Sequence, residues 1–173
     1  MKLIVWEIIF YLTVLAAWFL FRKLAKRNIT GDILAGSMLG MFYECATEPL
    51  CNYHFKITIY RDIPLAVIFA WGAMFAMVVF FSEKLYCSFL GKKKIVPYDK
   101  HIFIFDVLAG AIIGFPLGSM GSRLGLWEYR CDLFQWNWSE IPFFRMPPEI
   151  LVAYMLIMLT GPTFVRYWQG AFE

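Results

Sequence analysis

The chain has 173 residues, of which 61% are hydrophobic and 20% aromatic, and its formal net charge is +3. Soluble domains are usually about half apolar, so this composition excludes an ordinary soluble globular protein. The small positive charge does not indicate a nucleic-acid-binding protein, because the positions of the basic residues are better explained by membrane topology. We therefore expect a single membrane domain over residues 1–173, with no soluble domain.

Five apolar segments are long enough, or nearly so, to cross a bilayer core of about 30 Å. The first segment is not followed by a cleavage site of small residues, so we expect a retained helix and not a signal peptide. The predicted fold is all-α, a polytopic membrane protein with five transmembrane helices. The predicted spans are Leu3–Phe21, Ile33–Leu50, Ile63–Phe81, Ile102–Gly121 and Pro148–Val165.

One ten-residue stretch occurs twice, since Gly31–Gly40 returns with conservative changes as Phe105–Gly114, 74 residues later. Each copy is followed by an aromatic loop and then by an apolar run that begins with proline. A repeat of fixed period outranks local signals. We predict an extra helix over residues 1–28, followed by two parallel two-helix repeats over residues 31–86 and 105–168. Because each repeat crosses the membrane twice, the two would be related by a pseudo-two-fold axis along the membrane normal.

The basic residues predict the orientation of the chain. A basic cluster from Arg22 to Arg27 follows the first segment, and the run from Lys92 to Lys94 separates the two repeats. Lys and Arg accumulate in short cytoplasmic loops. With five spans, placing both groups inside puts the N-terminus outside and the C-terminus in the cytoplasm.

The second and fourth segments each carry a Gly-x-x-x-Gly motif, Gly36/Gly40 in one and Gly110/Gly114 in the other. Small residues four apart let two helices approach closely within lipid. Since the motifs occupy matched places in the two repeats, we predict that these two segments pack against each other through their glycines.

Three further acids have ordinary structural interpretations. Asp32 and Asp106 open the second and fourth segments, where an acid suits the positive end of the helix dipole. We therefore interpret both as helix-start residues. Glu7 stands near the outer end of the first segment and is interpreted as a residue that reaches the membrane interface.

The most informative pattern is that Glu44 and Glu48 continue the glycine row of the second segment at four-residue spacing, which places them on one stripe of a helix. The position in the second repeat that matches Glu44 is Gly118. We predict a gap beside Gly118 that the two glutamates enter, with Arg123 as their counter-charge. Ionisable groups at membrane depth are costly and usually functional. The alternatives are an acid–base pair and a structural Glu–Arg network.

Other candidates lie in the outer loops. Glu149 opens the fifth segment behind two prolines, where it is either a helix-start residue or a third acid. His54 lies in the first outer loop, and Trp127 and Tyr129 lie in the aromatic second one. These aromatic residues predict either a belt at the membrane interface or the lid of an apolar pocket.

Cofactor chemistry is not expected. The four cysteines fit no zinc or redox spacing, although Cys51 and Cys131 could form a disulfide if the outer side is oxidising. His54 and His101 fall on opposite predicted faces, so a histidine-based metal site is not expected. The chain also carries no glycine loop for a nucleotide.

The order Gly125-Leu-Trp-Glu-Tyr129, followed by Pro147-Pro-Glu149 at the start of an apolar helix, resembles the membrane lycopene cyclase domains and the related carotenoid hydratases. The resemblance covers mainly Asp106–Tyr154, with a fainter echo in Asp32–Trp71. Members of that family are small helical membrane proteins in which carboxylic acids protonate a polyene double bond without redox chemistry.

The resemblance implies that Glu149 is an acid of the site and that Trp127 and Tyr129 are walls of its pocket. The chain also departs from the family pattern. The family often has tandem acids after the proline, whereas Ile150 follows Glu149, and Gly118 stands where a further acid would be expected.

The sequence favours two functions over a third, transport of a small ion or solute, because two short repeats leave little room for a pathway unless the protein oligomerises. The first is an intramembrane enzyme that performs acid–base chemistry, of cyclisation or hydration type, on an isoprenoid or similar lipid. Glu44 would donate the proton, with Glu48 and Glu149 as its catalytic partners. The residues expected to bind the substrate are Arg123, Trp127, Tyr129 and His54. The alternative is a non-catalytic accessory subunit that binds other membrane subunits of a larger complex.

Overall fold

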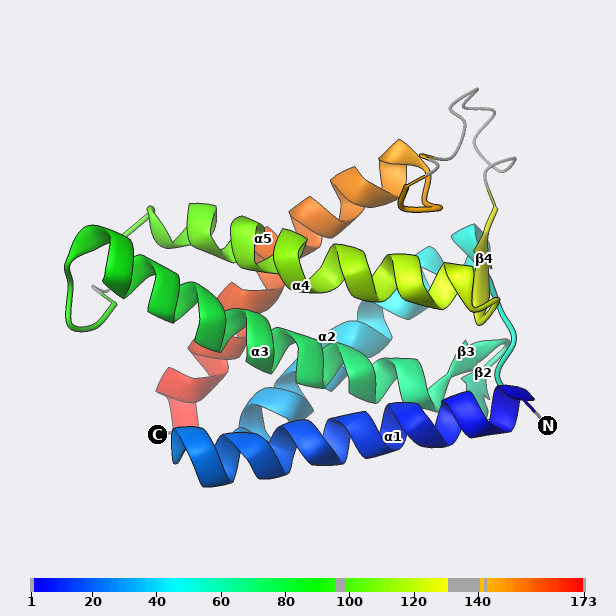
Figure 1. Ribbon diagram of the computed structural model, residues 1–173, viewed down its shortest axis with the longest axis horizontal. Coiled ribbons are helices and arrows are strands. Elements are labelled where there is room, and N and C mark those ends of the chain that lie inside the picture. Colours follow the sequence, from blue (N-terminus) through cyan, green and yellow to red (C-terminus); the bar gives the residue numbers. More distant parts are fainter. Residues whose placement is uncertain (1, 96–98, 131–140, 142, 173) are drawn as a thin grey trace.

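The computed structural model describes residues 2–95, 99–130, 141 and 143–172 of the chain. Five long helices form two layers (Figure 1). Helices α1 (Lys2–Leu20), α3 (Leu65–Leu90) and α4 (Ile102–Arg123) lie side by side on the viewed face. Helices α2 (Thr30–Thr47) and α5 (Pro148–Phe172) cross behind them and also contact each other.

Four of these helices are long and apolar enough to cross a membrane, which indicates an integral membrane protein. The first candidate span includes α1 and the π-helical turn η1 (Phe21–Ala25) that extends it. The other three lie on α3, α4 and α5. Helix α2, which contains most of the expected span Ile33–Leu50, is not among the candidates, because its apolar residues are interrupted by acids and small polar residues such as Asp32, Ser37 and Glu44.

Two short antiparallel ladders close one end of the bundle (Figure 1). Strand β1 (Cys51–Tyr53) follows α2 and the 3-10 turn η2 (Glu48–Leu50), and it pairs with β4 (Trp127–Tyr129). Strands β2 (Thr58–Tyr60) and β3 (Ile63–Pro64) form the second ladder. Strands β1, β2 and β4 lie where the sequence predicted loops, and β3 lies at the start of the expected span Ile63–Phe81. Strands of two or three residues are too short to show a two-residue period.

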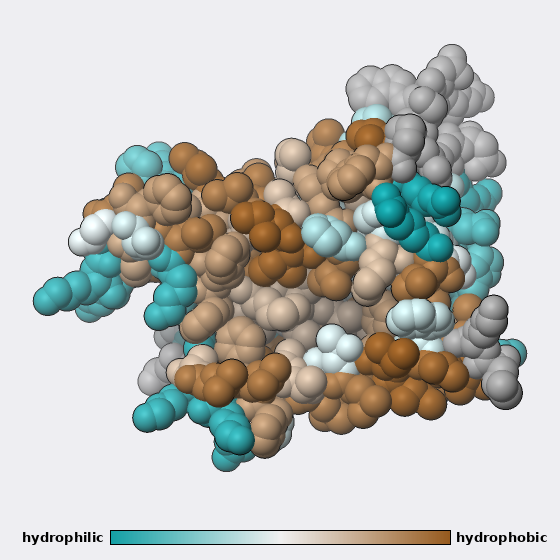
Figure 2. All heavy atoms as spheres, viewed as in Figure 1, coloured by the Kyte–Doolittle hydropathy of each residue, from teal (hydrophilic) through white to brown (hydrophobic). Residues whose placement is uncertain are grey.

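The surface is divided as expected for a protein that lies in a bilayer. Hydrophobic residues cover the middle of the viewed face, and hydrophilic residues gather toward its two ends (Figure 2). Helix α1 contributes a large part of this apolar surface. Its exposed large apolar side chains are Ile4, Val5, Ile8, Ile9, Leu12, Leu15, Phe19 and Leu20.

The glycine motifs lie at close helix contacts, but the prediction that α2 packs against α4 is wrong. Helix α3 runs between them, so the glycines of α2 face α3 and those of α4 face α5. A Cβ atom placed on Gly40 would lie 2.4 Å from the Cβ atom of Trp71. One placed on Gly110 would lie 2.1 Å from Cγ of Met158. The motif therefore correctly indicates close packing, although it does not identify the partner helix.

The closest approach of α2 and α3 gives a stability prediction. A Cβ atom on Gly72 would lie 2.3 Å from the carbonyl oxygen of Ile33, a backbone atom that cannot move unless α2 moves. We expect Gly72→Ala to lower the free energy of unfolding by about 1–3 kcal/mol through overpacking. The control is Gly114→Ala, whose Cβ atom meets the Tyr154 ring at an ordinary 3.4 Å. Thermal unfolding in detergent is the measurement, and equal melting temperatures for the two variants would contradict this packing.

Candidate functional site

An apolar cavity of about 200 Å³ lies toward the strand-capped end of the bundle. All five helices contribute to its wall, together with both strands of the β1–β4 ladder. The viewed face is hollowed between α1 and α4, where α3 forms the floor (Figure 2). The cavity therefore lies beside the apolar surface of the protein, where a molecule dissolved in the bilayer could reach it.

Glu44 lies in the last turn of α2. Among the described residues it is the only Asp, Glu, Lys, Arg or His on the cavity wall. Only 4% of the residue is exposed. The Trp71 indole N–H donates to its Oε1 atom and the Tyr53 hydroxyl donates to its Oε2 atom, both at 2.6 Å. In the described part of the chain, no ion pair includes Glu44. The carboxyl group is thus held in place by two neutral donors.

The sequence around Glu44 explains how these donors reach it. Gly40 lies one helical turn earlier, and its missing side chain leaves room for the Trp71 side chain against α2. The indole can then extend to the next turn, where Glu44 stands. Tyr53 comes from β1, which α2 leads into after the short turn η2. Gly118 of α4 lines the same cavity as Glu44, whereas Glu48 does not. The gap is therefore shared by only one of the two glutamates, and a Cβ atom on Gly118 would already meet Met146 and Tyr154 at 3.1 Å.

Aromatic rings form much of the remaining wall. Trp71 stacks on Tyr154 with ring centroids 5.8 Å apart, and Tyr53 meets Trp127 edge-on at 6.0 Å. Because alternate residues of a strand face the same side, the β1–β4 ladder directs Tyr53, Trp127 and Tyr129 to the cavity. Trp127 and Tyr129 therefore line the cavity, as expected if the second outer loop covers an apolar pocket.

The polar groups that the strands contribute to the cavity wall, those of Tyr53, Tyr129 and Cys51, are uncharged at neutral pH. Burial raises the pKa of the Tyr53 hydroxyl well above its usual range, and the neighbouring Glu44 raises it further. Burial is also the main cause that raises the pKa of Tyr129 and of the Cys51 thiol. Cys51 forms no disulfide with another described cysteine, and Cys131, its expected partner, lies outside the described residues.

The expectation that Arg123 is the counter-charge of the two glutamates is wrong. The Arg123 guanidinium donates instead to the carbonyl oxygen of Phe143. Glu48 lies in η2, outside the cavity wall, and its carboxylate pairs with Arg61 at 2.7 Å. Since η2 interrupts the helix after Thr47, Glu48 no longer continues the stripe that Glu44 occupies.

Two other candidates lie outside the cavity wall. Glu149 opens α5, and one of its carboxyl oxygens is buried without a hydrogen-bond partner among the described residues. His54 follows β1, and its Nε2 atom lies 3.8 Å from Glu128. The structure therefore brings Glu44 together with Trp127 and Tyr129, and it separates this group from Glu48, Glu149, His54 and Arg123.

The sequence analysis missed the two residues that hold Glu44, Trp71 and Tyr53. Neither lies near Glu44 in the periodic pattern. The repeat gave the only signal for them, because Leu50–Phe55 aligns with Leu124–Tyr129, which sets Tyr53 against Trp127, and the run Pro64–Trp71 corresponds to Pro147–Tyr154. The interpretation of Glu7 also changes. Glu7 is 3% exposed, and its carboxylate accepts hydrogen bonds from the backbone N–H groups of Lys56 and Ile57. It fastens α1 to the loop before β2 and does not reach the interface.

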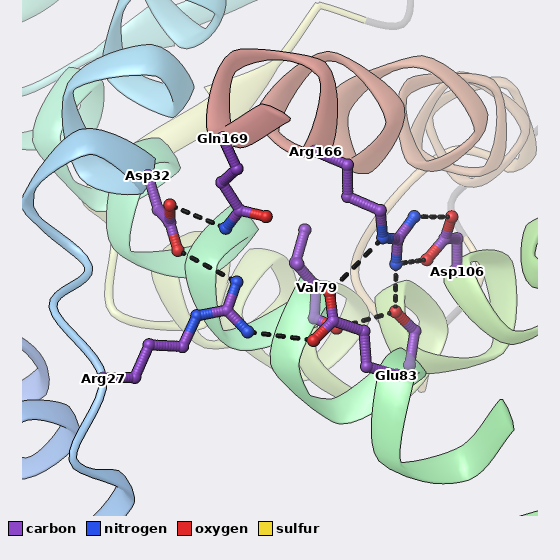
Figure 3. A network of polar contacts seen from close by, with 8 residues as sticks. Arg27, Asp32, Val79, Glu83, Asp106, Arg166 and Gln169 are labelled. Atoms are coloured by element: carbon purple, nitrogen blue, oxygen red, sulfur yellow. Dashed lines mark hydrogen bonds and ion pairs between the residues drawn. The ribbon is translucent and has the colours of Figure 1, made fainter. Parts of the chain in front are cut away.

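A second polar cluster connects the helices at their opposite ends (Figure 3). Asp106, in the second turn of α4, is fully buried and pairs with Arg166 of α5 through two hydrogen bonds of 2.7 Å. Arg166 also donates to the Ser82 hydroxyl of α3 and lies 3.6 Å from Glu83. The bidentate pair joins α4 to α5, and the contacts of Arg166 with Ser82 and Glu83 add α3 to the same cluster.

The same cluster extends to α2. Arg27 donates to Glu83 at 2.9 Å and to Asp32 at 3.5 Å, and the Gln169 side chain donates to Asp32 at 2.7 Å (Figure 3). Asp32 lies in the first turn of α2, as expected for a helix-start residue, whereas Asp106 lies beyond the first turn of α4, so the helix-start interpretation is wrong for Asp106. The hydrogen bonds of both side chains go to residues outside their own helices. Both acids connect helices.

Comparison with protein-family models, with curated proteins and with solved structures gave no match. Among the residues that the structure describes, no three His, Cys, Asp or Glu side chains converge in a way that could hold a metal ion. The geometry around Glu44 is therefore the main basis for a functional proposal.

Proposed function

We propose that the protein is an intramembrane enzyme that protonates a carbon–carbon double bond of an isoprenoid or similar lipid, with Glu44 as the acid. The observation that carries this proposal is a carboxyl group, 4% exposed and without an ion-pair partner among the described residues, on the wall of an aromatic-lined apolar cavity. A carboxyl group is costly in such surroundings and is usually kept for its chemistry.

The proposed reaction needs no redox partner. The Glu44 carboxyl group gives its proton to one alkene carbon, and the neighbouring carbon becomes a cation. Trp71 and Tyr154 line the cavity, and aromatic rings attract such a cation. In a cyclisation, a second double bond of the same molecule attacks the cation, and loss of a proton to the Glu44 carboxylate restores the acid. In a hydration, water adds instead, and the proton that it loses returns to Glu44.

The hydrogen bonds of Glu44 support this role by fixing its direction. General acids work within hydrogen-bond reach of the atom that receives the proton. Because Trp71 and Tyr53 each hold one carboxyl oxygen, the side chain cannot turn away from the cavity without the loss of both bonds. Tyr53 and Trp71 are thus positioning residues.

The size of the cavity limits how a substrate binds. Its volume of about 200 Å³ is below the roughly 300–1,000 Å³ typical of small-molecule pockets. A long polyene therefore inserts only one end beside Glu44, and the rest of the chain lies in the hollow between α1 and α4 or in the bilayer. This arrangement favours chemistry at the end of an isoprenoid chain over chemistry at its middle.

The proposed architecture has two repeats, and pairs of equivalent contacts support it. Gly40 lies against Trp71, and its repeat mate Gly114 lies against Tyr154. Gly36 likewise lies against Phe75, and Gly110 lies against Met158. The glycines correspond when Gly31–Gly40 is aligned with Phe105–Gly114. Their contact residues correspond when the proline-led run that begins at Pro64 is aligned with the one that begins at Pro147. Each copy then contains a glycine-bearing helix packed on its own returning helix.

We further propose that α2 is a fifth span, which places the N-terminus outside and the C-terminus in the cytoplasm. Lys23 lies in η1 at the end of the first candidate span, Asn52 lies in β1 after α2, and both are exposed. With an impermeant maleimide, we expect Asn52→Cys to be labelled on intact cells and Lys23→Cys only after the membrane is opened. The unsubstituted protein is the control for its natural cysteines. Labelling of both positions from outside would contradict this topology.

The enzyme proposal is tested by expressing the protein in cells that accumulate an acyclic carotenoid. Chromatography and mass spectrometry then compare the extracted pigments with those of cells that lack the protein. We expect a new product with the mass of the substrate, from cyclisation, or with the mass of the substrate plus water, from hydration. Unchanged pigments in cells shown to contain the folded protein would count against polyene chemistry.

The alternative is a non-catalytic subunit of a larger membrane complex. The observation that favours it is the long row of exposed apolar side chains on α1, which a partner subunit could cover as well as lipid can. In this case the protein would co-purify from a mild detergent with a stoichiometric partner, and Glu44 would only hold Trp71 and Tyr53 in place.

A further inference from the structure

A second cavity, of about 370 Å³, lies at the end of the bundle opposite the strands. Its polar lining consists of Arg27, Glu83, Lys84, Lys93 and Lys94. Arg27 follows the last turn of the first span, and Glu83 and Lys84 belong to the last turns of α3. The cavity therefore lies where these helices leave the apolar part of the protein, at the level expected for lipid headgroups.

The positive charge of this cavity is not neutralised within the described part of the chain. Its only acid, Glu83, is already shared between Arg27 at 2.9 Å and Arg166 at 3.6 Å. Lys93 and Lys94 take part in no ion pair among the described residues. Three lysines thus face one cavity beside a carboxylate that is already satisfied.

The remaining lining is apolar and suits an amphiphile. Phe80 and Ile95 border the same cavity, and the Lys84 ammonium lies 5.5 Å from the centre of the Phe80 ring. A headgroup that carries phosphate could be held by the lysines while the carbon chain next to it contacts Phe80 and Ile95.

We propose that this cavity binds the phosphate group of an anionic amphiphile, with Lys84, Lys93 and Lys94 as its charged contacts. Basic residues beside a membrane attract anionic headgroups, and lysine binds phosphate as a compact positive charge. The position at the membrane boundary favours a lipid over a soluble phosphate compound. The proposal does not depend on the chemistry at Glu44, which lies at the other end of α2 from the Arg27 side.

The test is lipid retention by the purified full chain, measured by native mass spectrometry from detergent micelles. Phosphatidylglycerol is titrated in one arm, phosphatidylcholine with the same acyl chains in a second, and inorganic phosphate in a third. We expect one phosphatidylglycerol to be retained preferentially. The double variant Lys93→Gln/Lys94→Gln should weaken that binding by roughly 10–30-fold, because each lysine near an anionic surface contributes about fivefold.

The matched control is Lys23→Gln/Lys100→Gln. It removes the same number of charges from exposed lysines at the same end of the protein but outside the cavity lining, and it should leave the affinity unchanged. If the protein binds inorganic phosphate but neither lipid, and the cavity variant loses that binding, the cavity is a phosphate site whose ligand is a soluble compound. Equal retention of the two lipids with no phosphate binding would overturn the proposal, and so would equal losses in the control and cavity variants.

Discussion

Replacement of Glu44 by glutamine is expected to abolish conversion of the polyene while the protein stays folded. Glutamine has nearly the same shape, and its amide oxygen can accept the Trp71 N–H while its amide nitrogen donates to the Tyr53 oxygen. It has no acidic proton to give to a double bond. Loss of a general acid costs roughly 10²–10⁴-fold in rate, so product should fall below detection in the pigment assay, with a melting temperature close to that of the unchanged protein.

Glu48→Gln is the matched control for this experiment. Glu48 makes its ion pair with Arg61, whose side chain is 60% exposed, and it lies outside the cavity wall. We expect full conversion by this variant. A Glu44→Gln protein that converts the polyene at the normal rate would remove Glu44 from the chemistry. One that unfolds would instead indicate that the hydrogen bonds with Tyr53 and Trp71 are its main contribution.

Asp106→Asn is expected to cause the largest loss of stability among single charge removals in the described residues. Asp106 is 0% exposed and is bound by Arg166 through two hydrogen bonds. When one partner of a buried pair is removed, the other charge is left poorly compensated, at a cost of about 3–5 kcal/mol. Since Arg166 keeps Glu83 at 3.6 Å, we expect a loss near the lower end of that range. The measurement is thermal or denaturant unfolding in detergent.

The control for Asp106 is Arg61→Gln, which breaks the exposed pair with Glu48. Exposed ion pairs contribute about 0–1 kcal/mol, so this variant should unfold close to the unchanged protein. Equal stability of Asp106→Asn and Arg61→Gln would mean that the cluster in Figure 3 does not hold the helices together.

The helices could be predicted from the sequence because long apolar runs leave few alternatives. All five expected segments lie mainly on long helices, and the candidate spans include four of them. Helix partners could not be predicted in the same way. Gly36 lies against the backbone of Gly72 and Gly110 lies against the side chain of Met158, but small residues carry no information about which helix approaches them. The prediction that α2 packs against α4 failed for that reason.

Glu44 could be found in the sequence because an acid in an apolar helix is conspicuous wherever it occurs. Its partners could not be found, since Trp71 lies 27 residues away and Tyr53 belongs to a three-residue strand. Glu48 was grouped with Glu44 on the assumption that the helix continues, whereas η2 begins at Glu48 and ends the shared stripe. Spacing is therefore a reliable guide only as far as the helix extends.

The ion cluster at the opposite end shows the same limit. Asp106 and Arg166 are 60 residues apart, and the sequence offers an adequate local explanation for the acid, namely the start of a helix. Only the packing of α4 on α5 brings the two charges together. Burial then makes the pair necessary, because an isolated charge in that place would be very costly.

The most direct test of the proposed site is an experimental structure of the protein purified from membranes in a mild detergent. The proposal predicts elongated non-protein density in the cavity, with one end beside the Glu44 carboxyl group and the rest leading into the hollow between α1 and α4. An empty cavity closed by protein side chains, together with a partner subunit packed over α1, would contradict it and favour the non-catalytic subunit.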